Sequence, residues 1–153
     1  MPKVSRSRVI AADLERVWSL VSDPYGLPRW WPRTRRVEDV RTGPGGKPAW
    51  TTVLETERGT GVRADYRCTA IEPQTMLAWE QQIEGTPFDR ILRASALEVR
   101  LDKAGQGTEV TLVADETLRG LSRLGAPMIS GASRKRLEEA LDGIEGALVG
   151  PTG

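Results

Sequence analysis

Hydrophobic and polar residues alternate along much of this 153-residue chain, and the period of the pattern changes after Leu121. Alternation at every second position predicts strands that cover one face, as at Leu97, Val99 and Leu101. After Leu121 the hydrophobic residues recur at helical spacing, and Pro127 is suited to a first helical turn. The sequence therefore predicts a series of strands followed by a long C-terminal helix that begins near Pro127. The hydrophobic stripe of this helix consists of Met128, Ile129, Ala132, Leu137, Leu141, Ile144 and Leu148.

Shorter elements are expected before these strands. Residues 3–10 have a strand pattern, and Asp13 can cap a helix that ends before Pro24, because the residue that precedes a proline resists helical geometry. Residues 25–32 are too rich in proline for a long helix and predict a short helical turn and a loop. Six more strands, separated by turn signals, are expected at residues 36–41, 50–57, 62–72, 76–84, 91–101 and 108–117.

The composition narrows the class of protein. Hydrophobic residues make up 39% of the chain and charged residues 28%, which is typical of a globular protein. Lys and Arg number 22 against 21 Asp and Glu, so the net charge of +1 lacks the basic surplus that nucleic-acid binding requires. The length suits one domain with one core, which we expect to span residues 1–153.

The sequence carries no targeting or membrane signal. It begins with Met-Pro-Lys and polar residues, and no stretch approaches the roughly 20 apolar residues of a membrane span. The one cysteine, Cys68, excludes an internal disulfide and fits a reducing compartment. We therefore expect a cytoplasmic monomer or homodimer whose partner is a small molecule, with neither a nucleic acid nor an integral membrane segment involved.

Histidine is absent from the sequence. Its absence excludes the commonest general base, the Ser-His and Cys-His nucleophile pairs, and the usual zinc and iron ligand sets. We expect no metal site and no cofactor, so any catalysis must rest on carboxylates, Tyr, Lys, Arg or ordered water.

Several segments together resemble the START/Bet v 1-like (SRPBCC) superfamily, and within it the polyketide cyclase/dehydrase group. The resemblance lies in residues 10–24 (IAADLERVWSLVSDP), 27–32 (LPRWWP), 70–79 (AIEPQTMLAW) and 107–112 (GTEVTL). It implies an α+β helix-grip fold, in which a curved seven-stranded antiparallel sheet wraps around the long C-terminal helix and two short helices follow the first strand. It also implies a cavity between sheet and helix that holds a small hydrophobic ligand, lipid-like or polyketide-like.

Strand alternation then indicates which side chains face such a cavity. Five of the eight aromatic residues are tryptophan, and large rings of this kind are typical both of a cavity wall and of a plain core. The candidate ligand-binding residues are Trp30, Trp31, Trp50, Thr52, Leu54, Tyr66, Trp79, Gln81, Ser95, Leu97, Leu112 and Met128.

Three residues are candidates for catalysis, and each has a plainer alternative. Arg93 can polarise a carbonyl or pair with a carboxylate, or it can be an exposed arginine near the end of a strand. Glu116 can act as a general base if burial raises its pKa, or it can be solvated. Tyr66 can donate its hydroxyl to a ligand oxygen, or it can be a core aromatic residue. Cys68 has no histidine partner and is interpreted as a small buried residue.

Residues 29–36 combine four arginines with two tryptophans. They can hold an anionic ligand tail or contact a membrane or a carrier protein. In the alternative, Trp30 and Trp31 pack onto the sheet and the arginines stay in water.

Two functions follow from these patterns. The first is binding of a hydrophobic small molecule, since the predicted cavity has no histidine, metal set or paired carboxylates. The second is a cyclase or aromatase activity, in which confinement of a flexible chain promotes cyclisation and dehydration. Arg93 and Tyr66 then stabilise oxyanion charge, and Glu116 or water transfers protons.

Overall fold

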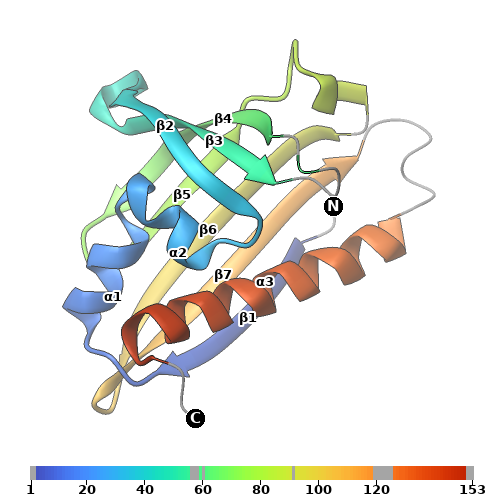
Figure 1. Ribbon diagram of the computed structural model, residues 1–153. Helices are drawn as coiled ribbons and strands as arrows, with labels where there is room; N and C mark the ends of the chain where they lie inside the picture. Colours follow the sequence, from blue (N-terminus) through green and yellow to red (C-terminus); the bar gives the residue numbers. More distant parts are fainter. Residues whose placement is uncertain (1–2, 56–58, 60, 91, 119–125, 151–153) are drawn as a thin grey trace.

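The computed structural model describes residues 3–55, 59, 61–90, 92–118 and 126–150, with the side chains of the last segment described from Gly131 onward. Its core architecture is a strongly bent antiparallel sheet around one long helix (Figure 1). Helix α3 (Ala126–Leu148) crosses the concave face of the sheet.

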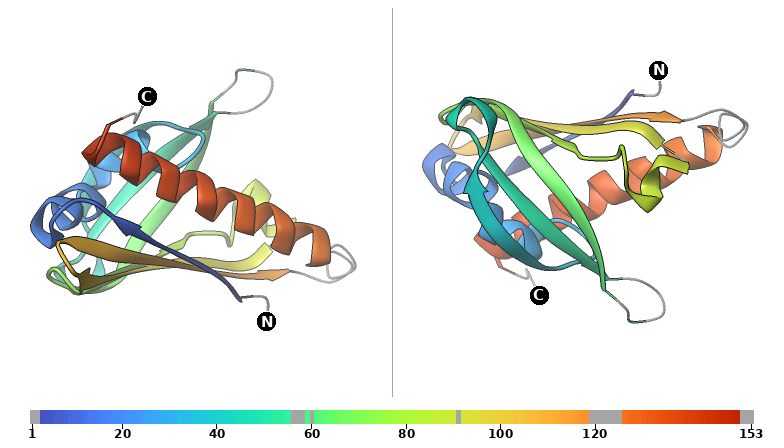
Figure 2. Two further views of the ribbon diagram at one scale, coloured as in Figure 1. Left: turned by 90° about the horizontal axis from the view of Figure 1, so that it is seen from below. Right: turned by 90° about the horizontal axis from the view of Figure 1, so that it is seen from above.

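Seven strands form the sheet in the order β1-β7-β6-β5-β4-β3-β2. Every neighbouring pair is antiparallel, as expected for consecutive strands joined by short turns. The views in Figure 2 show the sheet bending, so that β2 and β3 run at a steep angle to β6 and β7. The strands are β1 (Lys3–Ile10), β2 (Thr34–Thr42), β3 (Pro48–Glu55), β4 (Gly61–Glu72), β5 (Met76–Gln81), β6 (Leu92–Ala104) and β7 (Gly107–Leu118).

All seven predicted strands are confirmed, and the largest differences are at the ends of two of them. Strand β6 runs to Ala104, beyond the predicted end at residue 101. Strand β5 ends at Gln81, whereas the sequence predicted a strand to residue 84. The chain turns here because Thr86 N–H donates to the Ile83 carbonyl at 3.0 Å, and Gly85 has a φ of 80° that favours glycine. A 3-10 turn, η3 (Pro87–Arg90), follows and was not expected from the sequence.

The helical elements also follow the prediction. Helix α1 (Leu14–Val21) begins at Asp13, whose carboxylate accepts a hydrogen bond from Arg16 N–H at 2.9 Å. After it come the short turns η1 (Pro24–Gly26) and α2 (Leu27–Trp30), while η2 (Pro44–Gly46) lies in the hairpin between β2 and β3. The C-terminal helix begins at Ala126, one residue before the proline that marked its expected start.

The core lies between the concave face of the sheet and α3. Leu137, Leu141 and Ile144, spaced at helical intervals, are fully buried against the sheet. On the flank of the helix, Arg8 of β1 donates to Asp142 at 2.6 Å and to Glu138 at 3.0 Å, which holds α3 against the edge strand. The helix-grip fold expected from the sequence is confirmed. No helix in the described ranges is long and apolar enough to cross a membrane.

Candidate functional site

A cavity of about 690 Å³ lies between the concave face of the sheet and the first half of α3. Strands β3 to β7, the turn η3 and the segment after α2 all contribute to its wall. The apolar part of the lining consists of Trp31, Pro32, Leu54, Val62, Trp79, Phe88, Leu92, Ala96, Leu97, Ala114 and Leu137. The polar part consists of Arg33, Glu55, Tyr66, Gln81, Ser95, Glu116, Ser133 and Arg136.

A cluster of aromatic rings closes one end of this cavity. Trp79 of β5 makes edge-to-face contacts with Trp30, Trp31 and Trp50, at ring-centroid distances of 6.0, 6.2 and 5.7 Å. Trp50 is also stacked on Tyr66, with 6.0 Å between the centroids and 12° between the planes. Such contacts stabilise the rings beyond their burial alone, so this end of the cavity is a firm wall.

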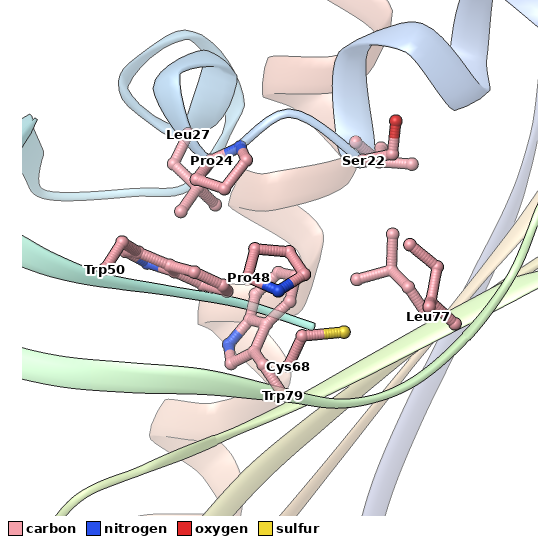
Figure 3. A pocket seen from close by; sticks show the side chains of 10 residues that line it. Ser22, Pro24, Leu27, Pro48, Trp50, Cys68, Leu77 and Trp79 are labelled. Atoms are coloured by element: carbon pink, nitrogen blue, oxygen red, sulfur yellow. The ribbon is translucent and has the colours of Figure 1, made fainter. Parts of the chain in front are cut away.

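A second, much smaller space lies behind the same cluster (Figure 3). Pro24 and Leu27 face Trp50, Pro48 and Leu77 across it, and its volume is about 10 Å³. That is close to the smallest space that holds one water molecule, so it offers no room for a ligand. The large cavity is therefore the candidate site.

A carboxylate and a cation meet on the wall formed by β7 and α3. Glu116 is 8% exposed, and its Oε1 accepts hydrogen bonds from the Ser133 hydroxyl at 3.1 Å and from Arg136 at 3.3 Å. The other oxygen, Oε2, accepts no hydrogen bond from the described residues. Glu116 is thus held in place through one oxygen, while the second is open to a ligand.

Tyr66 presents a neutral hydroxyl to the cavity. Burial raises the pKa of its phenol to about 12, an effect that the charge of Arg136 opposes and that of Glu116 supports. The hydroxyl therefore keeps its proton at neutral pH and can donate it in a hydrogen bond. No described residue accepts that hydrogen bond.

Gln81 ends β5 directly opposite Tyr66 in the sheet register. Its side-chain Nε2 is buried and has no hydrogen-bond partner among the described residues. A buried donor without a partner is costly, and native proteins rarely retain one unless another molecule satisfies it.

Seven of the twelve candidate ligand-binding residues line the large cavity, together with Glu116 from the catalytic set. They are distant from one another in sequence, and strand alternation placed all of them except Trp31 on the concave face. The eight residues are Trp31, Leu54, Tyr66, Trp79, Gln81, Ser95, Leu97 and Glu116.

The other ligand-binding candidates lie elsewhere. Trp30, Thr52 and Leu112 are buried but do not line the large cavity, and Trp50 lines the small space behind the aromatic cluster. Trp50, Thr52 and Leu112 share the strand faces of the lining residues Leu54 and Ala114, as the alternation predicted, whereas Trp30 packs in the core from α2. The side chain of Met128 lies outside the described residues.

Arg93 is the candidate that the structure places differently. The alternation predicted that it shares the face of Ser95 and Leu97, yet Arg93 is exposed and does not line the cavity. The register of β6 against β7 shifts between Leu92 and Ala94, and this irregularity interrupts the alternation. Leu92 lines the cavity in its place.

Some lining residues were not singled out from the sequence. Ser133 and Arg136 come from the edge of the α3 stripe. The hydrophobic period of the helix contained a weak signal for Ser133, which lies four positions before Leu137 and is buried. Nothing in the pattern distinguished Arg136 from the other charged residues of the helix.

Residues 29–36, which combine arginines with tryptophans, agree in part with each of the two interpretations given above. Trp30 is 2% exposed and packs in the core, while the side chains of Arg35 and Arg36 are exposed. Arg36 pairs with Glu38 at 2.6 Å. Arg33 differs because it lines the cavity and has a φ of 60°, which is uncommon for a residue other than glycine.

Cys68 lies beside the small space rather than in the large cavity. It is buried, and its thiol donates to the Ala70 carbonyl at 3.3 Å. Burial raises the pKa of this thiol, so the protonated form is favoured and the thiolate nucleophile is disfavoured.

The sequence and the fold were compared with those of known proteins. The family model described as polyketide cyclase / dehydrase and lipid transport matches residues 1–148. The comparison with curated proteins finds no match.

Solved structures similar to this one come from several bacteria. A START superfamily protein from Mycobacterium smegmatis has a TM-score of 0.78 at 17% identity, covering 96% of this chain and 97% of its own. The Zhui aromatase/cyclase from a Streptomyces species has a TM-score of 0.75 at 19% identity, covering 95% and 92%. A protein from Arthrobacter aurescens has a TM-score of 0.73 at 25% identity, covering 99% and 88%.

Proposed function

Because the chain belongs to the polyketide cyclase/dehydrase and lipid transport family, we propose that it binds a small hydrophobic molecule, lipid-like or polyketide-like, in its large cavity. The main support for this proposal is the cavity itself. Its volume of about 690 Å³ lies within the range of roughly 300–1,000 Å³ that is typical of small-molecule sites. Its wall is mainly apolar, with a few polar groups that can fix the orientation of a ligand.

The driving force for binding is the removal of apolar surface from water. Each Å² of apolar surface that a ligand buries here contributes about 25 cal/mol, which favours extended or fused-ring molecules over small polar ones. Trp31 and Trp79, which meet edge to face in the aromatic wall, add ring surfaces against which an unsaturated or ring-containing ligand can pack.

Native mass spectrometry of the purified protein tests this proposal. We expect a bound hydrophobic molecule, or uptake of one from a mixture of lipids and aromatic polyketide-like compounds. Leu92→Trp, which places a large ring in the cavity wall, should abolish uptake. Ala94→Trp is the matched control, because Ala94 is exposed on the same strand and does not line the cavity. Equal uptake by both variants would show that binding occurs elsewhere.

A cyclase activity is the second candidate, and the polar wall favours it. Glu116 presents a free carboxylate oxygen, and Tyr66 a protonated hydroxyl, to the same cavity. In a confined chain, Glu116 can accept a proton from a carbon next to a carbonyl, while Tyr66 donates a hydrogen bond to the enolate oxygen that forms. Arg136 of α3 lines the same cavity and takes the role proposed for Arg93, which is to stabilise negative charge on the ligand.

Incubation with poly-β-ketone chains tests the cyclase. We expect the wild-type protein to change the distribution of cyclised products, and Glu116→Gln to remove this effect while the chain still binds. An unchanged distribution in the presence of the wild-type protein would exclude the cyclase and leave the binding function in place.

A further inference from the structure

Two side chains that carry hydrogen-bond donors lie on neighbouring strands and line the same cavity. Tyr66 of β4 and Gln81 of β5 are direct partners in the antiparallel register, and both line the cavity. The adjacent residue, Gln82, donates its backbone N–H to the Asp65 carbonyl at 2.7 Å. The Tyr66–Gln81 pair therefore occupies a position without ladder hydrogen bonds, where opposed side chains are closest. Their Cβ atoms are expected about 4.5–5.5 Å apart.

Both groups lack an acceptor. The Gln81 Nε2 is buried without a partner, and no described residue accepts the proton of the Tyr66 hydroxyl. Burial holds the pKa of this phenol near 12, so the hydroxyl remains a donor throughout the neutral range. Stacking on Trp50 fixes the plane of the Tyr66 ring and limits where its hydroxyl can point.

The rest of the polar lining does not satisfy these donors. Glu116 of β7 accepts hydrogen bonds from Ser133 and Arg136 of α3, and from neither Tyr66 nor Gln81. Strands β4 and β5 therefore present donors to a ligand, and an apolar ligand without an acceptor leaves both of them unpaired. The penalty of an unpaired buried donor is large enough to select among ligands of equal shape.

We propose that Tyr66 and Gln81 form a donor pair that binds one carbonyl oxygen of the ligand. The inference rests on the proposed binding function and names its ligand class: a hydrophobic ketone or ester rather than a plain hydrocarbon. The two donors approach the two lone pairs of the same oxygen, as their position on adjacent strands allows. The pair thereby fixes how far and in which orientation the ligand enters the cavity.

Two probes of nearly equal shape test the donor pair. Methyl naphthyl ketone carries a carbonyl where ethylnaphthalene carries a methylene group. We expect the wild-type protein to bind the ketone roughly 10-fold more tightly, as two hydrogen bonds of ordinary strength require. Tyr66→Phe and Gln81→Met should each reduce this preference, and the double variant should abolish it while ethylnaphthalene still binds.

The chain offers a matched control for each change. Tyr25→Phe and Gln82→Met remove the same groups from exposed positions outside the cavity lining. Infrared spectroscopy of the bound ketone adds a direct signature, because hydrogen bonds to the carbonyl lower its stretching frequency. We expect a lowered frequency in the wild type and both controls, and a partial return in each cavity variant.

The outcomes separate this inference from the function on which it rests. Equal affinity of the wild type for the two probes, or a preference that survives in the double variant, would overturn the donor pair alone. Failure of the wild type to bind either probe would overturn the donor pair together with the proposed binding of small hydrophobic molecules.

Discussion

Gly143 lies directly against the backbone of Trp30, since a methyl group on Gly143 would stand 2.5 Å from the Trp30 carbonyl oxygen and 2.7 Å from its Cα. Helix α3 can cross α2 at this short distance only because residue 143 has no side chain. The contact holds Trp30 in the aromatic cluster at the end of the cavity. A glycine of the helix thus determines where the cavity wall stands.

Gly143→Ala should destabilise the protein by about 2 kcal/mol, because the added methyl group forces two backbones apart. Gly146→Ala is the matched control: a methyl group there meets nothing within 4 Å, and alanine favours the helix by about 0.5–1 kcal/mol. Urea unfolding measures both changes. Equal free energies of unfolding for the two variants would contradict the close crossing.

The hydrogen bond between Ser133 and Glu116 should contribute measurably to stability. Ser133 is 4% exposed, so Ser133→Ala removes a buried hydrogen bond to a charged group, which costs about 1.5–3 kcal/mol. A double-mutant cycle of Ser133→Ala with Glu116→Gln measures the coupling by urea unfolding. We expect a coupling energy of about 1 kcal/mol, and additive effects would show that the two side chains do not interact.

The raised pKa of Tyr66 makes stability depend on alkaline pH. The phenol has a pKa of about 12 in the folded protein against 10.0 as a reference, so the folded state keeps a proton that the unfolded chain releases between these values. The stabilisation is complete below pH 10 and is lost as the pH rises toward 12. Unfolding free energies measured across this range should fall more steeply for the wild type than for Tyr66→Phe.

The ultraviolet absorbance of tyrosinate supplies a control for that experiment. The chain has two tyrosines, and the difference between the titrations of the wild type and Tyr66→Phe isolates the signal of Tyr66. A transition well below pH 12 in this difference would mean that the hydroxyl is in contact with water.

The ion pairs of Arg8 should stabilise the protein in a salt-dependent way. Arg8 contacts Glu138, Asp142 and Glu145 of α3, and these bonds raise the pKa of its guanidinium. Its partners are well exposed, so we expect Arg8→Met to cost only about 1 kcal/mol at low salt, and less at high salt. Arg41→Met, which breaks a local and exposed pair with Asp39, should have a smaller effect. Equal losses in the two variants would argue against a role for Arg8 in holding the helix.

The sequence predicted the faces of most strands because side chains in a strand alternate strictly. Tyr66, Gln81 and Glu116 each follow a regular register and face the cavity as expected. Arg93 does not, because the register shift between Leu92 and Ala94 moves the pattern by one position. No feature of composition or spacing near Arg93 signals such an irregularity.

The helix side of the cavity was harder to predict. The hydrophobic stripe shows which face of α3 is covered, but not which strand each residue meets. Arg136 contacts Glu116 because of how the helix crosses β7, and that crossing depends on tertiary packing. The partners of a charged residue at the edge of a stripe therefore require the structure.

The position of β1 beside β7 has a consequence for how the chain folds. Ser7 and Thr111 are joined by a hydrogen bond of 2.8 Å between their hydroxyls, although 104 positions separate them in the sequence. During synthesis, β1 must therefore wait until β7 has been made before the two strands can pair. Pairings this distant in sequence slow folding, since the ends of a long loop must meet before any contact stabilises them. The edge of the sheet that borders α3 is thus among the last parts of the molecule to form.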